Sequence, residues 1–464
     1  MQDCTGLPCL GNVVAGRQLR SLAEEFLKAA IARTISGLLT STRARDFRRG
    51  LFATHRRMRG APACVRYFHQ ADDPYSHLML QALPALVENY KVRLELHLVP
   101  PPDSAAAPDR ERLQAWSRRD AVDLASVTGL EFEDPGQQPD PAATGLGNRV
   151  LAAALLTGIP VGSLVSLAST VGRELWRGNI TELERMPAST RDQADAILDA
   201  GRALRARLGH YLGATLNFEG EWYWGADRLG YLEQRLRATG LARTTCTAPI
   251  VRLPRVECRH SPTNGHRPEF HFFCSLRSPY TYLAVQRVLE LAARYDARLQ
   301  LRFVLPMVMR GLPVPRQKRL YILADAKREA DTLGLPFGRI VDPVGVPTER
   351  GLAVLHRAIA EGRGPQFLES FLRGVWAEGV DAGGDVGLHL LALRSGLDES
   401  LVATALDDTS WRAVATANRE QMLALGLWGV PSFGVDDGPA RWGQDRLWLV
   451  ERDLIAATQA EAAD

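Results

Sequence analysis

Ser278-Pro279-Tyr280-Thr281 holds the residue types best suited to chemistry in this chain. It follows a short apolar run at 269–273 and precedes apolar residues with helical spacing at 283–292. Proline suits the first helical turn, where a missing N–H group costs nothing, so we expect Ser278 at the helix N-cap. A hydroxyl there can donate a hydrogen bond to a thiolate brought in by a ligand, and the helix dipole also lowers the thiol pKa. Plain capping is the simpler role for Ser278.

The elements that position Ser278 can be predicted from the pattern of the chain. A strand at 269–273, a helix and a second alternating strand at 299–303 form a crossover long enough for parallel pairing. A mostly helical insertion then extends from 306 to 426, with helices predicted at 321–333, 349–361, 365–378, 384–395 and 398–407. A hairpin after Pro431 and a closing helix from Asp445 complete the order.

The first half of the chain repeats these motifs. Asp73-Pro74-Tyr75-Ser76 lies 205 positions before Ser278-Pro279-Tyr280-Thr281, and Trp224–Leu229 lies 218 positions before Trp442–Leu447. Matches in the same order with a drifting offset indicate a tandem duplication with insertions. The predicted strands at 65–68 and 92–98 and the turn at 219–220 repeat the order of elements. The apolar stretch at 150–168 is broken by Gly and Pro, so we interpret it as two buried helices, not a membrane span.

Four segments follow from this organisation. Residues 1–60 form a basic helical extension, 61–243 the first copy, 244–267 a linker rich in Thr, Pro, Arg and His, and 268–464 the second copy. In the extension, Leu19, Leu22, Phe26 and Ala30 have the spacing of an amphipathic helix. We expect this helix to pack on the first copy with its arginines outward. An anionic membrane or a nucleic acid is the alternative partner.

The composition excludes several classes of protein. With 464 residues, of which 46% are hydrophobic and 23% charged, the chain is neither a disordered polymer nor a collagen-like fibre. The net charge of +3 gives no general case for a nucleic-acid partner. Six cysteines without a Cys-x-x-Cys pair, and a start unlike a secretory signal, predict a cytoplasmic protein without stable membrane insertion.

Taken together, the order of elements and the motifs Ser-Pro-Tyr, Gly-Val-Pro and Trp-Gly-x-Asp-Arg-Leu resemble the DsbA-like branch of the thioredoxin fold. Within that branch the sequence is most similar to 2-hydroxychromene-2-carboxylate isomerases and kappa-class glutathione transferases. The resemblance is clear over 267–455 and weak over 63–238. It implies an α/β protein with two tandem thioredoxin-like (DsbA-like) domains, each with a helical insertion.

The resemblance also assigns roles to residues of the second copy. Ser278 takes the place of the first cysteine of the disulfide oxidoreductases, so dithiol exchange lacks its sulfur atoms. Val430 and Pro431 match the cis-proline position, where the backbone pairs with the cysteinyl part of glutathione. Gln444 and Asp445 match the site of the γ-glutamyl group.

Lys318 resembles the basic residue that meets the glycyl carboxylate of glutathione in this family, although a solvated basic helix start is the simpler interpretation. The asparagine that often precedes this lysine in the family has no counterpart here. Trp428 and Tyr280 are candidates for an aromatic acceptor pocket or for core packing. Cys274 is expected to be a buried apolar residue, and no metal site is predicted.

The first copy departs from the pattern. Asp73 stands in place of Ser278, and an anionic side chain repels a thiolate. We align Gly213-Ala214-Thr215 with Gly429-Val430-Pro431, so the proline is absent. We therefore expect the first copy not to activate glutathione, and to support the second copy in an intramolecular pseudo-dimer.

The function implied is a glutathione-dependent isomerase of the 2-hydroxychromene-2-carboxylate type, or a transferase, acting on a small aromatic substrate with a thiolate held by Ser278. The resemblance also leaves a homo-oligomer open. The alternative is a non-catalytic DsbA-like module that binds a peptide or protein partner along the strand before Pro431. Intact Ser278, Pro431 and Asp445 favour the enzyme.

Overall fold

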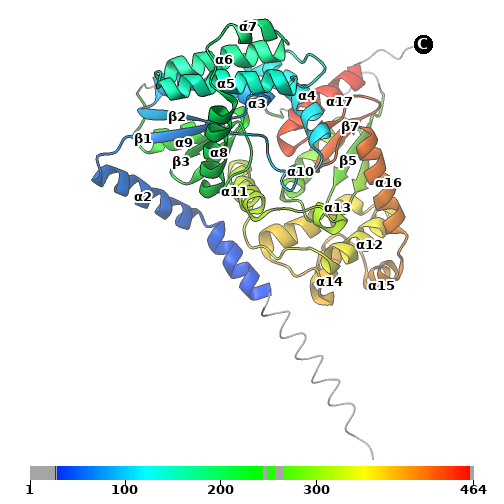
Figure 1. Cartoon of the computed structure of the whole chain (residues 1–464). Coiled ribbons are helices and arrows are strands. Elements are labelled where there is room, and N and C mark those ends of the chain that lie inside the picture. The colour runs from blue at the N-terminus through cyan, green and yellow to red at the C-terminus, as the bar shows by residue number, and fades with distance from the viewer. Residues whose placement is uncertain (1–26, 28, 244–247, 257–264, 460–464) are drawn as a thin grey trace, which may run out of the picture.

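The computed structural model describes residue 27 and residues 29–243, 248–256 and 265–459. Its elements form two α/β halves that lie against each other (Figure 1). Each half has one four-stranded sheet surrounded by helices. Three of the four residues that define the predicted N-terminal amphipathic helix lie outside the described residues.

The first sheet has the strand order β2-β1-β3-β4. Its strands are β1 (Ala63–His69), β2 (Val92–Leu98), β3 (Thr215–Phe218) and β4 (Glu221–Trp224). β1 is parallel to β2 and antiparallel to β3, and β3 and β4 form the hairpin predicted at 219–220. In strand β1, Val65, Tyr67 and Phe68 are inaccessible to solvent, whereas Cys64 and Arg66 are partly exposed.

The second sheet repeats this arrangement with the order β6-β5-β7-β8. Its strands are β5 (Glu269–Cys274), β6 (Arg298–Phe303), β7 (Ser432–Val435) and β8 (Arg441–Trp442). β5 is parallel to β6 and antiparallel to β7, which confirms the predicted crossover and hairpin. The rings of Phe272 and Phe433 stack across β5 and β7 with centroids 5.5 Å apart, in the middle of the core.

Helices of the first half cover its sheet. They are α3 (Pro74–Asn89), α4 (Arg110–Thr128), α5 (Pro141–Thr157), α6 (Val161–Trp176), α7 (Ile180–Glu184), α8 (Arg191–Leu208) and α9 (Leu229–Ala238). The apolar stretch at 150–168 falls in α5 and α6, as predicted, and its buried side chains belong to the core of the first half. No described helix is long and apolar enough to cross a lipid bilayer.

Helices of the second half confirm the predicted insertion. They are α10 (Pro279–Arg294), α11 (Arg316–Leu333), α12 (Val346–Ala360), α13 (Gly364–Arg373), α14 (Asp385–Arg394), α15 (Glu399–Asp407), α16 (Trp411–Ala424) and α17 (Leu447–Gln459). The sequence analysis did not distinguish α16. That helix buries Trp411, Ala415 and Met422, and its Asn418 amide donates to the carbonyl of Phe303 at 3.0 Å.

The strand registers correct the alignment of the two copies by one residue. Thr215 lies opposite Trp224, and Ser432 lies opposite Trp442, so Thr215 corresponds to Ser432. Ala214 therefore corresponds to Pro431, where our alignment had placed Thr215. Ala214 has φ of +51°, in the left-handed region. Proline is fixed near φ of about −65°, so this backbone excludes it.

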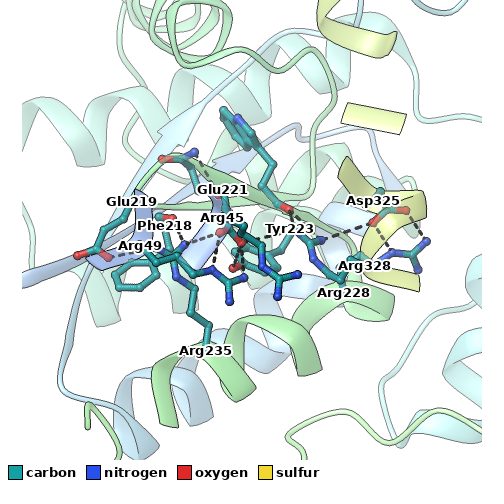
Figure 2. A network of polar contacts seen from close by, with 12 residues as sticks. Arg45, Arg49, Phe218, Glu219, Glu221, Tyr223, Arg228, Arg235, Asp325 and Arg328 are labelled. Carbon is teal, nitrogen blue, oxygen red and sulfur yellow. Dashed lines mark hydrogen bonds and ion pairs between the residues drawn. The ribbon is translucent and has the colours of Figure 1, made fainter. Parts of the chain in front are cut away.

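The described part of the N-terminal extension follows the predicted amphipathic helix, whose own packing lies outside the described residues. Residues 29–39 are helical, and α2 (Thr42–Met58) continues along the outside of the molecule (Figure 1). Arg49 points inward, and its guanidinium group pairs with Glu221 at 2.6 Å (Figure 2). The guanidinium group of Arg56 pairs with Glu219 at 2.9 Å. Acidic side chains at the β3–β4 turn attract these two arginines, whereas Arg43, Arg48 and Arg57 of α2 are exposed.

The extension also contacts the second half. Arg33 donates to the carbonyl of Gly379 at 3.3 Å, and the Thr40 hydroxyl donates to the carbonyl of Gly338 at 3.3 Å. The Ser36 hydroxyl accepts from the backbone N–H of Ile340 at 2.9 Å. The extension is therefore a strap that is bonded to both halves.

Candidate functional site

One cavity of about 540 Å³ lies between the two halves. The N-terminus of α3, the first turns of α4 and the start of α9 line it from the first half. The starts of α10, α11 and α17 and the segment before β7 line it from the second. All six residues that the sequence analysis placed in the site line this cavity, namely Ser278, Lys318, Val430, Pro431, Gln444 and Asp445.

Ser278 is the N-cap of α10, as predicted. Its hydroxyl oxygen accepts a hydrogen bond from the backbone N–H of Thr281 at 3.1 Å. The same hydroxyl donates weakly to the carbonyl of Val430 at 3.4 Å. The hydroxyl proton therefore lies between α10 and the cis-proline segment. A ligand bound there could accept it in place of the Val430 carbonyl.

The Val430–Pro431 peptide is cis, the geometry that the resemblance implied. The Pro431 carbonyl accepts from the backbone N–H of Gly443 at 3.0 Å, which fixes this segment against the start of the last helix. A Cβ atom on Gly429 would lie 2.5 Å from the ring of Trp442. Glycine is therefore required at this position, because the indole closes one side of the cavity.

Asp445 is held by arginines from both halves. Its Oδ2 accepts from Arg228 of the first half at 2.9 Å, and its Oδ1 lies 3.7 Å from Arg446. Burial raises the pKa of the Asp445 carboxyl, but the Arg446 and Arg228 charges outweigh burial and hold the pKa at about 2. Asp445 is an anion at any neutral pH, and it is suited to bind a ligand ammonium group.

Gln444 lines the cavity, but its side chain is engaged in the interior. The amide oxygen accepts from Arg287, and the amide nitrogen donates to Glu329 at 2.8 Å. The side chain is buried with both ends bonded. What remains for a ligand at this position is the backbone at the helix start.

Lys318 projects from the first turn of α11 toward the first half. Its ammonium group donates to the carbonyl of Ala106 at 2.8 Å and lies 5.7 Å from the ring centroid of Trp428. Burial without a carboxylate partner lowers the pKa of Lys318 to about 8. The position is consistent with binding a ligand carboxylate, which would restore the usual pKa.

The matching position in the first half is closed by its own hydrogen bonds. Asp73 caps α3, and its Oδ2 accepts from the backbone N–H and the hydroxyl of Ser76 at 3.0 and 2.8 Å. The Ser76 hydroxyl oxygen also accepts from the backbone N–H of Ala214 at 2.9 Å. The carbonyl of Ala214 accepts from Gly225 at 2.9 Å, so this strand edge has no free backbone group at Ala214.

Burial raises the pKa of the Asp73 carboxyl to about 7, although hydrogen bonds from Ser76 oppose the shift. Asp73 therefore titrates near neutral pH inside the cavity. An aspartate that changes charge in this range cannot stabilise a thiolate as a hydroxyl does.

Two buried arginines cross between the halves. Arg228 makes a two-pronged ion pair with Asp325 of α11 at 2.8 and 2.9 Å (Figure 2). Arg446 makes the equivalent pair with Asp120 of α4 at 2.6 and 2.7 Å. Each carboxylate also accepts from a tyrosine hydroxyl, Asp325 from that of Tyr280 at 2.9 Å and Asp120 from that of Tyr75 at 2.7 Å.

The sequence analysis missed this arrangement. The two Asp-Arg motifs and the two Ser/Asp-Pro-Tyr motifs are visible in the sequence as repeats, but the partners of their arginines are not. Asp120 and Asp325 are 205 positions apart, which is also the spacing of Tyr75 and Tyr280. A search for further residue pairs at that offset finds them.

Other candidates give no chemistry. Cys274 is fully buried at the end of β5, as expected, and burial raises the pKa of its thiol. Among the described residues, no group of three or more His, Cys, Asp and Glu side chains is arranged to hold a metal ion.

Comparison with protein families gives the same assignment for the second half of the chain. Residues 269–454 match the model of the DsbA-like thioredoxin domain, so the second half of the chain is such a domain. It is homologous to 2-hydroxychromene-2-carboxylate isomerase of Pseudomonas putida, which is 24% identical over 188 residues that make up 39% of this chain and 91% of that enzyme.

Solved structures give more distant likenesses. A selenomethionine 2-hydroxychromene-2-carboxylate isomerase has a TM-score of 0.34 and 23% identity, over 40% of this chain and 93% of that one. A probable DsbA oxidoreductase from Streptomyces coelicolor has a TM-score of 0.35 and 20% identity, over 43% and 93%. The cytosolic disulfide reductase DsbM from Pseudomonas aeruginosa with GSH has a TM-score of 0.30 and 21% identity, over 40% and 99%.

Proposed function

We propose that the second half of this chain is a glutathione-dependent enzyme, an isomerase of the 2-hydroxychromene-2-carboxylate type or a kappa-like transferase. The observation that carries the proposal is the Ser278 hydroxyl, which caps α10 and lies 3.4 Å from the carbonyl of Val430 in the cis-proline segment. A hydroxyl in place of a cysteine leaves the thiol to be supplied by the ligand. Homology to the isomerase supports the same assignment.

The residues present fit glutathione. The backbone of Val430 would pair with its cysteinyl unit, Asp445 would hold its γ-glutamyl ammonium group, and Lys318 would face its glycyl carboxylate. When bound, glutathione supplies a thiolate that acts as a reversible nucleophile on an unsaturated aromatic carbonyl compound. Ser278 would donate a hydrogen bond to the sulfur, and the start of α10 would add the positive end of its dipole.

We also propose that residues 61–243 are a second, degenerate DsbA-like domain that arose by duplication. Support comes from the equal strand order of the two sheets and from the matched Tyr–Asp–Arg contacts. In this view the first half does not bind glutathione. It contributes a wall of the acceptor pocket, on which Tyr75, Trp116 and Trp224 offer aromatic surface.

Calorimetric titration of the full chain with reduced glutathione tests the proposal, with thiolate absorbance followed against pH. We expect one equivalent to bind and the thiol pKa to fall from about 8.5 to below 7.5. Asp445→Asn should weaken binding, and Ser278→Ala should bind glutathione without the thiolate signal.

Two matched variants separate capping from thiol activation. Ser278→Asp keeps a capping oxygen and should still abolish the thiolate, because it copies the Asp73 position. Ser400→Ala, on the exposed start of α15, should change neither signal. If millimolar glutathione does not bind, the enzyme assignment is wrong, and a module that binds a peptide partner takes its place.

A further inference from the structure

The N-terminal strap presents apolar side chains to solvent. On the helix at 29–39 and on α2, large side chains point away from the body, among them Leu38 with 65%, Phe47 with 68% and Met58 with 83% of its surface exposed. Others on the strap are Leu27, Ile31, Ile35, Leu39 and Leu51, whereas the ring of Phe52 lies beside Gly220 of the first half. So many large exposed apolar side chains on one segment are uncommon on soluble proteins unless something binds there.

The strap cannot turn this apolar face inward. On α2, Phe47, Leu51 and Met58 are four and seven residues apart, which places them on one side of the helix. Arg49 and Arg56 project from the opposite side and pair with Glu221 and Glu219. Because the charged side is bonded to the body, the apolar side stays outward.

Arginines flank the apolar face of α2. By helical position Arg43 and Arg57 lie along one edge of the face, and Arg48 and Arg59 lie along the other. All four are exposed, and none makes an ion pair with a residue in the described part of the chain. The three arginines with carboxylate partners, namely Arg45, Arg49 and Arg56, are the less exposed ones.

We propose that the strap binds the surface of an anionic lipid bilayer. Its apolar face would enter the boundary between headgroups and acyl chains, and the flanking arginines would meet lipid phosphates. Pairing with a second copy is disfavoured, because the same four arginines of each copy would face each other. Asp46 is the one acidic residue of α2, and it already lies 3.3 and 3.8 Å from Arg45 and Arg49.

Co-sedimentation of the full chain with vesicles tests the proposal. We expect the protein to pellet with phosphatidylglycerol/phosphatidylcholine vesicles, and to bind pure phosphatidylcholine vesicles at least about tenfold more weakly. High salt should reduce binding to the anionic vesicles, because the attraction to their headgroups is screened.

Two groups of variants test the apolar face and the flanking arginines. Phe47→Glu/Leu51→Glu should reduce binding at least about tenfold, because it removes apolar area that would enter the bilayer and adds two negative charges there. Replacing the four flanking arginines by glutamine should remove the preference for anionic vesicles. Val386→Glu, a change at an equally exposed apolar residue on α14, should bind as wild type does. Circular dichroism and thermal melting verify that each variant is folded.

Absence of binding to anionic vesicles overturns the proposal, and so does equal binding by Phe47→Glu/Leu51→Glu. A dimer in light scattering that this double variant converts to a monomer, together with no vesicle binding, would show that a second copy covers the face.

Discussion

Arg228→Met should destabilise the protein strongly, because Arg228 is the buried centre of an ion-pair network between the two halves. Its guanidinium group makes two bonds to Asp325, one to Asp445 at 2.9 Å and an ion pair with Glu329 at 3.4 Å. Asp325 is 1% exposed. Removing one partner of a buried ion pair costs about 3–5 kcal/mol, because the other charge stays buried without compensation.

Urea unfolding, followed by tryptophan fluorescence and by circular dichroism, measures this loss. The matched control is Arg357→Met, whose partner Glu361 is exposed on the same helix at 3.1 Å. That exposed pair is expected to contribute about 0.5 kcal/mol or less. In a double-mutant cycle, Arg228→Met combined with Asp325→Asn should be less harmful than the sum of the single changes by about 0.5–3 kcal/mol.

The pH dependence gives a second test of the same contact. The folded pKa of Asp445 is about 2, below its ordinary value of 3.8, so the carboxylate stabilises the fold above pH 3.8. This stability is lost as the pH falls from 3.8 to 2, and the loss should be smaller in Arg228→Met. A destabilisation below about 1 kcal/mol, or additive changes in the cycle, would refute a buried crossed network.

Three further outcomes are expected. Asp73→Asn should flatten the pH profile of stability between pH 4 and 7. The folded pKa of Asp73, about 7, lies above its ordinary value of 3.8, so wild type loses up to about 4 kcal/mol of stability as the pH rises through this window; an unchanged profile in urea titrations at several pH values would contradict this. Ala214→Pro would place a proline where the second half has Pro431, and it should destabilise the protein by about 3 kcal/mol in the same assay. The backbone φ of +51° excludes proline, and the hydrogen bond from the Ala214 N–H to the Ser76 hydroxyl is lost. A neutral change would show that this segment can adopt the geometry of the second half. Gly429→Ala should cost about 1–3 kcal/mol and shift the near-ultraviolet circular dichroism of Trp442, because the new methyl group would lie 2.5 Å from the indole and displace it. An unshifted spectrum would contradict this, because it would mean that the indole keeps its place.

Local patterns predicted the elements of the sheets and most helices, because apolar periodicity and turn residues are set within short windows. The family resemblance, not the local pattern, placed Ser278, the Pro431 segment and Asp445 in one site, and in the structure they line one cavity. The inward orientation of the Gln444 side chain could not be predicted, since it depends on a hydrogen bond to Glu329 in α11, more than a hundred residues away.

The remaining misses have the same origin. The one-residue misalignment at Ala214 came from matching residue types where the hydrogen-bond register decides. The orientation of the strap depends on Glu219 and Glu221, which follow α2 by more than 150 residues in sequence. The pairs that Arg49 and Arg56 make with Glu221 and Glu219 leave no periodic trace in the sequence, unlike the repeated Tyr–Asp pairs.

The crossed arginines have a consequence for the behaviour of the cavity on dilution. Between separate chains, an interface with buried charges at its centre would open as the concentration falls. Here Arg228 and Arg446 and their partners belong to one polypeptide, so the local concentration of one half near the other is of millimolar order whatever the bulk value. The walls of the cavity therefore stay together at nanomolar protein, and ligand binding per molecule should not depend on how dilute the solution is.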